Sequence, residues 1–478
     1  MNERYRKLRV GLVGLGLDAY WPQFEGLKER LTGYLDELAT QITRDSREVV
    51  RLGLVDCAER ALEAAHAARR EDIEILLVYA TTYALSATVL PVIQRAGVPV
   101  ILLNLQPESA LDYAAVNAMK NRTAMTSEWL AYCSACPVPE IANVLRRLEI
   151  PFHQVTGVLH NDPVSAQQLE EWMLAAEVVH GLAHSRLGLM GHYYGGMLDI
   201  ATDLAQVSGR FGLWIEMLEV DELSALRRGV EPKALQAKVA AFRQFFAVGT
   251  DCAQSELERA ARTAVALDRL VQAKRLDLMA YFYSGTGVAE NLDTVTSIIL
   301  GASMLTGQRV PVAGEYEVKN AVAMKIMDLL GAGGSFTEFY GMDFRDDVVL
   351  MGHDGPGHTG IAEGKILVRP LQVYHGKVGA GLSVEMSVRH GAVTLLSVVE
   401  DRERGFRLLI AEGESVAGAT LEIGNTNSRY RFALGARGFA EAWNAQGPAH
   451  HCAVGTGHIA GTLEKVASLL GIPSVRVC

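Results

Sequence analysis

Continuous apolar runs alternate with helical segments through the first hundred residues, and this alternation constrains the fold more than any other feature of the sequence. The runs cover residues 9–16, 50–55, 73–79 and 98–104. In the first intervening segment, 27–38, apolar residues recur at the spacing of one helical face. Strands that are apolar along their whole length and are joined by helices form parallel sheets covered on both faces. The first part of the chain is therefore predicted to be a parallel α/β domain.

A second α/β region follows. Near residue 345 the alternation of predicted strands and helices ends. Apolar runs at 186–191 and 276–283 again alternate with helical segments. Beyond residue 345 short strand-like runs follow one another directly, and His390-Gly391 between two of them is typical of a hairpin turn. This pattern predicts an antiparallel barrel. The predicted fold class is α/β, with two consecutive parallel-sheet domains over 1–160 and 161–335 and a C-terminal antiparallel β-barrel domain with a terminal helix over 336–478.

The size and charge of the chain exclude several classes of protein. It has 478 residues, a net charge of −10 and a hydrophobic fraction of 49%. That hydrophobicity argues against disorder, and the acidic balance argues against a nucleic-acid partner. Apolar stretches such as 73–84 are shorter than the roughly 20 residues needed to cross a membrane. Basic residues before the run 10–17 resemble a short signal peptide, but Asp18 ends that run, so we expect a buried strand and a cytoplasmic protein.

Two local motifs are compatible with a ligand but also have ordinary explanations. Residues 11–16 follow the pattern G-x-x-G-x-G, which differs from the dinucleotide fingerprint, and close packing of a strand against a helix also explains these glycines. Cys133 and Cys136 form a single C-x-x-C, which is compatible with zinc binding, redox chemistry or simple packing. They lie within 105–139, a stretch that breaks the alternation of strands and helices and is predicted to be irregular.

Glutamates and histidines gather around the junction of the second and third predicted domains. Glu315, Glu338 and His353 each stand near glycine at the end of a predicted element, and His450-His451 precede the last helix. Glycine lets the backbone turn such side chains into a cavity. Two carboxylates and two imidazoles suit Mn²⁺ or another divalent metal such as Co²⁺ or Mg²⁺. On spacing alone, Glu315 could instead interact with a helix dipole, and Glu338 and His353 could be surface residues.

Four motifs around these residues resemble the L-arabinose isomerase family in order and spacing. They are AGE-x-x-x-K at 313–319, GGSF-x-E-x-Y at 333–340, VLMGH at 349–353 and AHH at 449–451. The resemblance implies two α/β domains followed by a β-barrel. It also implies that Glu315, Glu338, His353 and His451 are metal ligands, usually for Mn²⁺, and that Glu315 and Glu338 form the acid–base pair.

The sequence departs from that family at positions that contact the sugar. Leu17-Asp18-Ala19-Tyr20 stands where those proteins carry Gln-His-Leu-Tyr, and Cys133-Ser-Ala-Cys136 where they carry Gln-Thr-Ala-His. The segment after His353, Asp354-Gly-Pro-Gly-His358, also differs. The expected substrate-binding residues are Tyr20, His192, Met197, His358 and His450. Glu317 is only a reserve candidate for the metal. On a helix its side chain would point about 200° away from that of Glu315, so the two would not face the same ion.

These features predict a metal-dependent aldose–ketose isomerase, an intramolecular oxidoreductase that acts on a small-molecule sugar through an enediol intermediate. One carboxylate would remove the proton beside a carbonyl, and the other would manage the hydroxyl proton. The resemblance implies a homo-oligomer, a tetramer or hexamer. Two alternatives stay open: a non-catalytic sugar-binding protein, because two α/β domains in series resemble the lobes of periplasmic-type binding proteins, and a sugar epimerase or lyase on the same scaffold.

Overall fold

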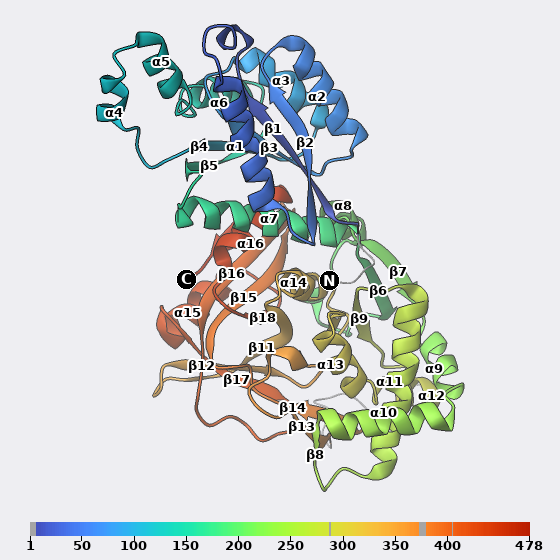
Figure 1. Cartoon of the computed structure of the whole chain (residues 1–478). Helices are drawn as coiled ribbons and strands as arrows, with labels where there is room; N and C mark the ends of the chain where they lie inside the picture. Colours follow the sequence, from blue (N-terminus) through green and yellow to red (C-terminus); the bar gives the residue numbers. More distant parts are fainter. Residues whose placement is uncertain (1–5, 286–287, 372–378, 404) are drawn as a thin grey trace. The chain divides into compact units, whose positions relative to one another are not determined.

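The computed structural model describes residues 6–285, 288–371, 379–403 and 405–478, and it falls into two compact units (Figure 1). The first unit is Met1–His180 and the second is Gly181–Cys478. Each unit has a parallel sheet of its own, and the second unit also contains a barrel. The finer division into three domains, with boundaries after residues 160 and 335, stays a prediction.

The first unit is built on a five-stranded parallel sheet in the order β2-β1-β3-β4-β5. Every residue of β3 is buried, which explains why this strand is apolar along its whole length. The strands are β1 (Leu8–Leu15), β2 (Arg47–Val55), β3 (Ile75–Ala80), β4 (Val100–Gln106) and β5 (Phe152–Val158). The helices that accompany them include η1 (Asp18–Tyr20), α1 (Leu27–Ile42), α2 (Ala58–Arg70), α3 (Ser86–Ala96), α6 (Val138–Arg147) and α7 (Pro163–Ala183).

Glycines in β1 let this strand pack closely against its neighbours. A Cβ added to Gly14 would lie 2.4 Å from Leu35 Cδ1 of α1, and one added to Gly11 would lie 2.5 Å from Ile73 Cδ1. The apolar face predicted on α1 is buried, and its residues are Leu27, Leu31, Tyr34, Leu35 and Leu38. Close packing therefore accounts for these two glycines of the run at 11–16.

The prediction of an irregular stretch at 105–139 is wrong, because this stretch contains two short helices. Helix α4 (Tyr113–Ala118) is capped by Asp112, whose carboxylate accepts a hydrogen bond from the Ala115 amide. Helix α5 (Arg122–Leu130) is capped by Asn121, whose side-chain oxygen accepts a hydrogen bond from the Thr123 amide. Each cap satisfies amides that the first turn of a helix leaves without an intrahelical partner.

The second unit begins with a four-stranded parallel sheet in the order β10-β9-β6-β7. Its strands are β6 (Arg186–Gly191), β7 (Trp214–Leu218), β9 (Leu278–Phe282) and β10 (Val312–Ala313). The helices of this region are η2 (Leu198–Ile200), α8 (Leu204–Phe211), α9 (Val220–Arg228), α10 (Pro232–Phe245), α11 (Gln254–Lys274), α12 (Ala289–Val295), α13 (Ile299–Gly307) and α14 (Val318–Leu329). Among the described residues, no helix is both long enough and apolar enough to cross a bilayer.

Helix α14 connects the sheet to the barrel within this unit. It contacts β9 on one side and the barrel strands β11, β15 and β18 on the other (Figure 1). All of its residues from Val318 to Asp328 are buried, so every face of the helix packs against other parts of the protein. The N-terminus of α14 is therefore held in a fixed position beside the barrel.

Six antiparallel strands close into a barrel in the order β15-β18-β11-β12-β17-β16, because β15 also pairs with β16. These strands are β11 (Gly333–Asp343), β12 (Val348–His353), β15 (Gly391–Asp401), β16 (Gly405–Val416), β17 (Thr426–Phe432) and β18 (His451–Thr456). The remaining elements are η3 (Thr359–Ile361), α15 (Gly435–Asn444), α16 (Ala460–Leu469) and β19 (Ser474–Arg476), which pairs with β16. The predicted fold class, parallel α/β sheets followed by a C-terminal antiparallel barrel, is confirmed.

The predicted hairpin at His390-Gly391 is wrong. The strand before it, β14 (Gly381–Glu385), belongs to a separate three-stranded sheet with β13 (Leu367–Leu371) and β8 (Ala247–Val248). The strand after it, β15, pairs with β16 and β18. The two strands that flank His390-Gly391 therefore enter different sheets, which local alternation of apolar residues cannot reveal.

Gly352 of β12 allows a direct test of barrel packing. A Cβ added there would lie 2.0 Å from the backbone carbonyl oxygen of Thr426 on β17. Because backbone cannot move aside as a side chain can, Gly352→Ala is expected to lower the free energy of unfolding by about 3 kcal/mol, measured by urea denaturation. Gly341→Ala on the neighbouring strand β11 is the matched control, since its added Cβ meets nothing within 4 Å. Equal stability of the two variants would contradict this account.

Candidate active site

Three neighbouring barrel strands bring residues from distant parts of the sequence together. Glu338 on β11 pairs with His451, the first residue of β18. On the other edge of β11, Glu338 pairs with Gly352, and His353 follows directly at the end of β12. The ring of Phe336 packs against both imidazoles, 4.4 Å from His353 and 4.4 Å from His451, and these two rings lie 5.2 Å apart. The register of the sheet therefore places one carboxylate and two imidazoles in a single region.

Glu315 reaches the same region from the turn between β10 and α14. Its φ is 56°, and the φ of Tyr316 is 62°. A non-glycine residue in such a sparsely populated conformation costs of order 1–3 kcal/mol and persists only where the surroundings impose it. Here the Tyr316 amide donates a hydrogen bond to the Tyr281 carbonyl at 3.0 Å. The strained turn holds Glu315 Oε2 3.3 Å from His451 Nε2.

Glu317 contacts the other nitrogen of the His451 ring. Its Oε2 lies 3.4 Å from His451 Nδ1, and both side chains are fully buried. Glu315 and Glu317 both precede α14, so the argument that a helix would point them apart does not apply, and they flank His451 from two sides. Burial alone would lower the pKa of His451, but the two carboxylates raise it to about 9. A carboxylate on the second nitrogen fixes the orientation of a histidine ring, as is common at metal sites.

His450 is held by Asp199, a residue that the sequence analysis did not single out. His450 Nδ1 lies 2.6 Å from Asp199 Oδ2, and the His450 amide donates to the same oxygen at 2.9 Å. Its Nε2 lies 3.9 Å from Glu315 Oε2 and 4.0 Å from Glu338 Oε2. Burial raises the pKa of Asp199, but the contacts with His450 outweigh it and leave the pKa below its usual range. No motif surrounds Asp199, so only the fold reveals this pairing.

These side chains meet at a cavity of about 180 Å³ in the second unit. Its described lining residues are Tyr194, Met197, Glu315, Glu338, Tyr340, His353, Asp354 and His450, and none of them is a lysine or an arginine. Burial raises the pKa of Glu338; Glu315 and Asp354 raise it further, against the opposing effect of His451 and His450. A cleft carboxyl with increased proton affinity is a candidate for proton transfer.

The donor atoms fit a divalent cation. Ligand atoms of Glu315, His450 and His451 all lie within 4.8 Å of one another. Several buried carboxylates converge here, and oxygen and imidazole donors together suit Mn²⁺, Co²⁺ or Mg²⁺. His353 lines the same cavity, but the Gly355 amide donates to its Nδ1 at 2.9 Å, which leaves the proton of a neutral ring on Nε2. The geometry thus groups His450 with Glu315 and His451, two of the four ligands that the family resemblance implies.

The loop after β6 contributes two lining residues to the cavity. Tyr194 and Met197 line it, as expected for a loop at the carboxyl end of a parallel strand. His192, at the start of the same loop, is exposed, and its ring lies 5.4 Å from that of Phe282. Of the two residues predicted from this loop, the structure places Met197 at the cavity and His192 outside its described lining.

Neither His358 nor Tyr20 is among the described lining residues of the cavity. His358 is buried, its amide donates to Ser335 Oγ at 3.1 Å, and burial lowers its pKa. Tyr20 belongs to η1 of the first unit, where its ring lies 5.9 Å from that of Phe24 in an edge-on arrangement. A role for either residue in substrate binding stays a prediction.

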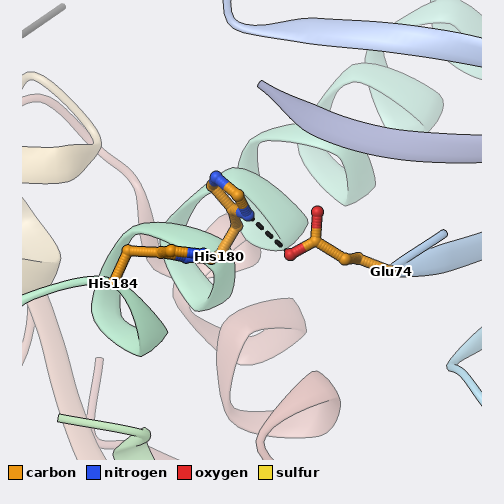
Figure 2. Close-up of side chains that lie close together, drawn as sticks. All are labelled: Glu74, His180 and His184. Carbon is orange, nitrogen blue, oxygen red and sulfur yellow. Dashed lines mark hydrogen bonds and ion pairs between the residues drawn. The ribbon is translucent and has the colours of Figure 1, made fainter. Parts of the chain in front are cut away.

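In the first unit, the carboxylate of Glu74 lies beside the imidazole of His180, as Figure 2 shows. His180 of α7 lies with Nδ1 2.6 Å from Glu74 Oε1 and with Nε2 2.5 Å from the Arg6 carbonyl oxygen. Burial raises the pKa of Glu74, but His180 outweighs this effect, and the pKa is lowered. Figure 2 also draws His184, which belongs to the second unit. Because both nitrogens of His180 contact the protein, this histidine ties α7 to the start of β3.

The C-x-x-C motif lies in the turns between α5 and α6. Cys133 is buried and Cys136 is exposed, and both are free thiols. Burial, with the neighbouring Cys136, raises the pKa of Cys133 to about 12. A thiol that stays protonated at neutral pH is a poor nucleophile and a poor metal ligand. This favours the interpretation of Cys133 as a packing residue.

Comparison with known proteins identifies the barrel. Residues 333–473 match the family model described as the L-arabinose isomerase C-terminal domain. No curated protein matches the chain. A solved structure from Legionella pneumophila, an ABC sugar transporter (periplasmic sugar binding protein), shares 13% sequence identity over 68% of this chain and 94% of that chain, with a TM-score of 0.14, which is too low to support an argument. The barrel region of the chain is therefore similar to the C-terminal domain of the L-arabinose isomerase family.

Proposed function

We propose that this protein is a metal-dependent aldose–ketose isomerase that acts on a sugar through an enediol intermediate. The L-arabinose isomerase C-terminal domain points to a sugar isomerase. The observation that carries the proposal is the convergence of Glu315, Glu338 and His450 on one small cavity, with His451 directly behind it. The family resemblance also supports a homo-oligomer of four or six chains, and the acidic composition of the chain suits a cytoplasmic location.

The metal would be held by Glu315, Glu338, His450 and His451, and His353 would join them only if its Nε2 lost the proton that the Gly355 hydrogen bond leaves there. When bound, the ion would polarise a substrate carbonyl and stabilise negative charge on adjacent oxygens. Glu317 would keep the His451 ring in place from its second nitrogen, and Asp199 would do the same for His450. The donor types allow Mn²⁺, with Co²⁺ or Mg²⁺ as substitutes.

Isomerisation moves one proton between two neighbouring carbon atoms and another between their oxygen atoms. Glu338 would take the proton from the carbon beside the carbonyl and return it to the neighbouring carbon, because burial gives this carboxyl a higher pKa and so a higher proton affinity. Glu315 would manage the hydroxyl proton. Both carboxylates end each turnover in the state in which they began, so the reaction needs no further reagent.

The test is a product assay on metal-stripped protein. Aldopentoses and aldohexoses, including L-arabinose, D-galactose and L-fucose, are incubated with the protein in the presence and absence of Mn²⁺. We expect a ketose to appear only with the metal, because the buried carboxylates alone cannot stabilise the charge that develops on the substrate. Bound metal without any ketose would point to another enediolate reaction, such as epimerisation. No ketose and no bound metal would favour a sugar-binding protein.

A further inference from the structure

The cavity contains a third carboxylate, Asp354, that the proposed reaction does not use. Asp354 is 9% exposed and lines the cavity with Glu315 and Glu338. Its Oδ1 lies 3.6 Å from His353 Nδ1. The VLMGH motif that resembles the L-arabinose isomerase family ends at His353, and the segment Asp354–His358 that follows it departs from that family.

The loop that carries Asp354 is buried and hydrogen-bonded along its length. All residues from 354 to 358 are buried. The Gly357 amide donates to Ser303 Oγ at 3.1 Å, and the His358 amide donates to Ser335 Oγ at 3.1 Å. The backbone at Gly357 is also in close contact with β17, because an added Cβ would lie 2.7 Å from Thr426 Cγ2. Asp354 is therefore presented by a rigid support, which is what selective recognition requires.

The neighbours of Asp354 form a polar wall of the cavity. Tyr340 lines the same cavity, and its hydroxyl accepts a hydrogen bond from Asn425 Nδ2 at 2.9 Å. Burial raises the pKa of Tyr340, and the negative charges of Asp354 and Glu338 raise it further, so both carboxylates lie near this phenol. His450 and His451, by contrast, contact Glu315. The wall near Asp354 is thus formed by Asp354, Tyr340 and His353, and His450 lies beside Glu315.

A ligand for this wall must bring hydrogen-bond donors and no negative charge. Among the described lining residues three are carboxylates and none is a lysine or an arginine, so an anionic group would be repelled. A carboxylate accepts hydrogen bonds at two oxygens, which matches two neighbouring hydroxyl groups. Hydrogen bonds to a charged group contribute more than neutral ones.

We infer that Asp354 is a specificity-determining residue that binds hydroxyl groups of the sugar beyond the two carbon atoms that react. The inference rests on the proposed function. Asp354 sets which hydroxyl configurations are accepted, and it rejects analogues that lack the hydroxyl. A buried site built to bind a hydroxyl discriminates strongly against its absence, because a hydrogen bond to a charged group is then lost.

The experiment uses the full chain loaded with Mn²⁺ and measures binding of the polyols ribitol, xylitol, L-arabinitol and galactitol by calorimetry. In Asp354→Asn and Asp354→Ala, the Kd of the best polyol is expected to rise on the order of 10- to 100-fold, with unchanged Mn²⁺ affinity. The ratio of kcat/KM between the best sugar and its deoxy analogue should shrink in parallel. Asp45→Asn is the matched control, since Asp45 is exposed in the first unit.

The outcomes separate this inference from the proposed function. Polyol binding that is unchanged in both Asp354 variants would overturn the inference about Asp354. Loss of Mn²⁺ binding in these variants would also overturn it, because Asp354 would then support the metal site. Absence of polyol binding to the Mn²⁺-loaded wild type would overturn it as well. If the wild type converts no sugar but binds a polyol that the variants bind more weakly, the role of Asp354 stands and the isomerase proposal falls.

Discussion

Replacing Glu338 by glutamine is expected to reduce kcat by at least about 1,000-fold at saturating Mn²⁺, because an amide cannot accept the proton and return it. The fold should be unaffected, since glutamine has the size of glutamate and β11 pairs with both β12 and β18 around this position. The measurement is the initial rate of ketose formation with the best sugar of the panel. Polyol binding in the same variant should persist, which would show that the cavity is intact.

Glu414→Gln is the matched control for this prediction. Glu414 is exposed on the barrel strand β16, so loss of its charge should leave kcat and stability unchanged. A Glu338→Gln protein with the kcat of the wild type would rule out Glu338 as the group that moves the proton. Turnover that a higher Mn²⁺ concentration restores would mean that Glu338 serves only to hold the ion.

Replacing His451 by glutamine is expected to weaken Mn²⁺ binding by at least about 100-fold, because it removes a ligand atom at the centre of the site. It should also lower the free energy of unfolding of the metal-free protein by about 3 kcal/mol, since two buried carboxylates lose the group between them. Those carboxylates are Glu315 and Glu317, whose side chains are 7% and 0% exposed. Mn²⁺ titration followed by electron paramagnetic resonance measures the first effect, and urea denaturation in a chelator measures the second.

Two further variants separate binding of the ion from stability. His450→Gln should weaken Mn²⁺ binding with little effect on stability, because the His450 side chain is 37% exposed. Glu317→Gln should weaken Mn²⁺ binding about 10- to 100-fold through the orientation of His451. Wild-type Mn²⁺ affinity in His451→Gln would contradict the assignment of this residue as a ligand.

The α/β part of the fold was predictable because its signals are local. The apolar face from Leu27 to Leu38 and the apolar run of β3 are each contained within one element. Side chains at Asp112 and Asn121, which cap α4 and α5, were also local signals, and attention to them would have corrected the irregular stretch. The partner of β14 was not predictable in this way, because strand pairing is decided by distant residues.

The candidate site was predictable in its residue types but not in its pairings. The motifs identify Glu315, Glu338, His353 and His451. They give no sign that Glu315 adopts a left-handed conformation, or that Glu317 approaches the same ring from the opposite nitrogen. These arrangements arise where α14 begins against the barrel, and they exist only in the folded protein.

The pairing of β11 with β18 has a consequence for the order of folding. His451 and Glu317, which contact each other, are 134 residues apart in sequence. Contacts between such distant residues form late and slowly, after the local helices and strands. The cluster around His451 therefore comes into existence only when the last barrel strand has inserted. An ion bound by this cluster would stabilise the closed barrel over every state in which β18 is detached, so occupancy of the site would report that the chain has completed folding.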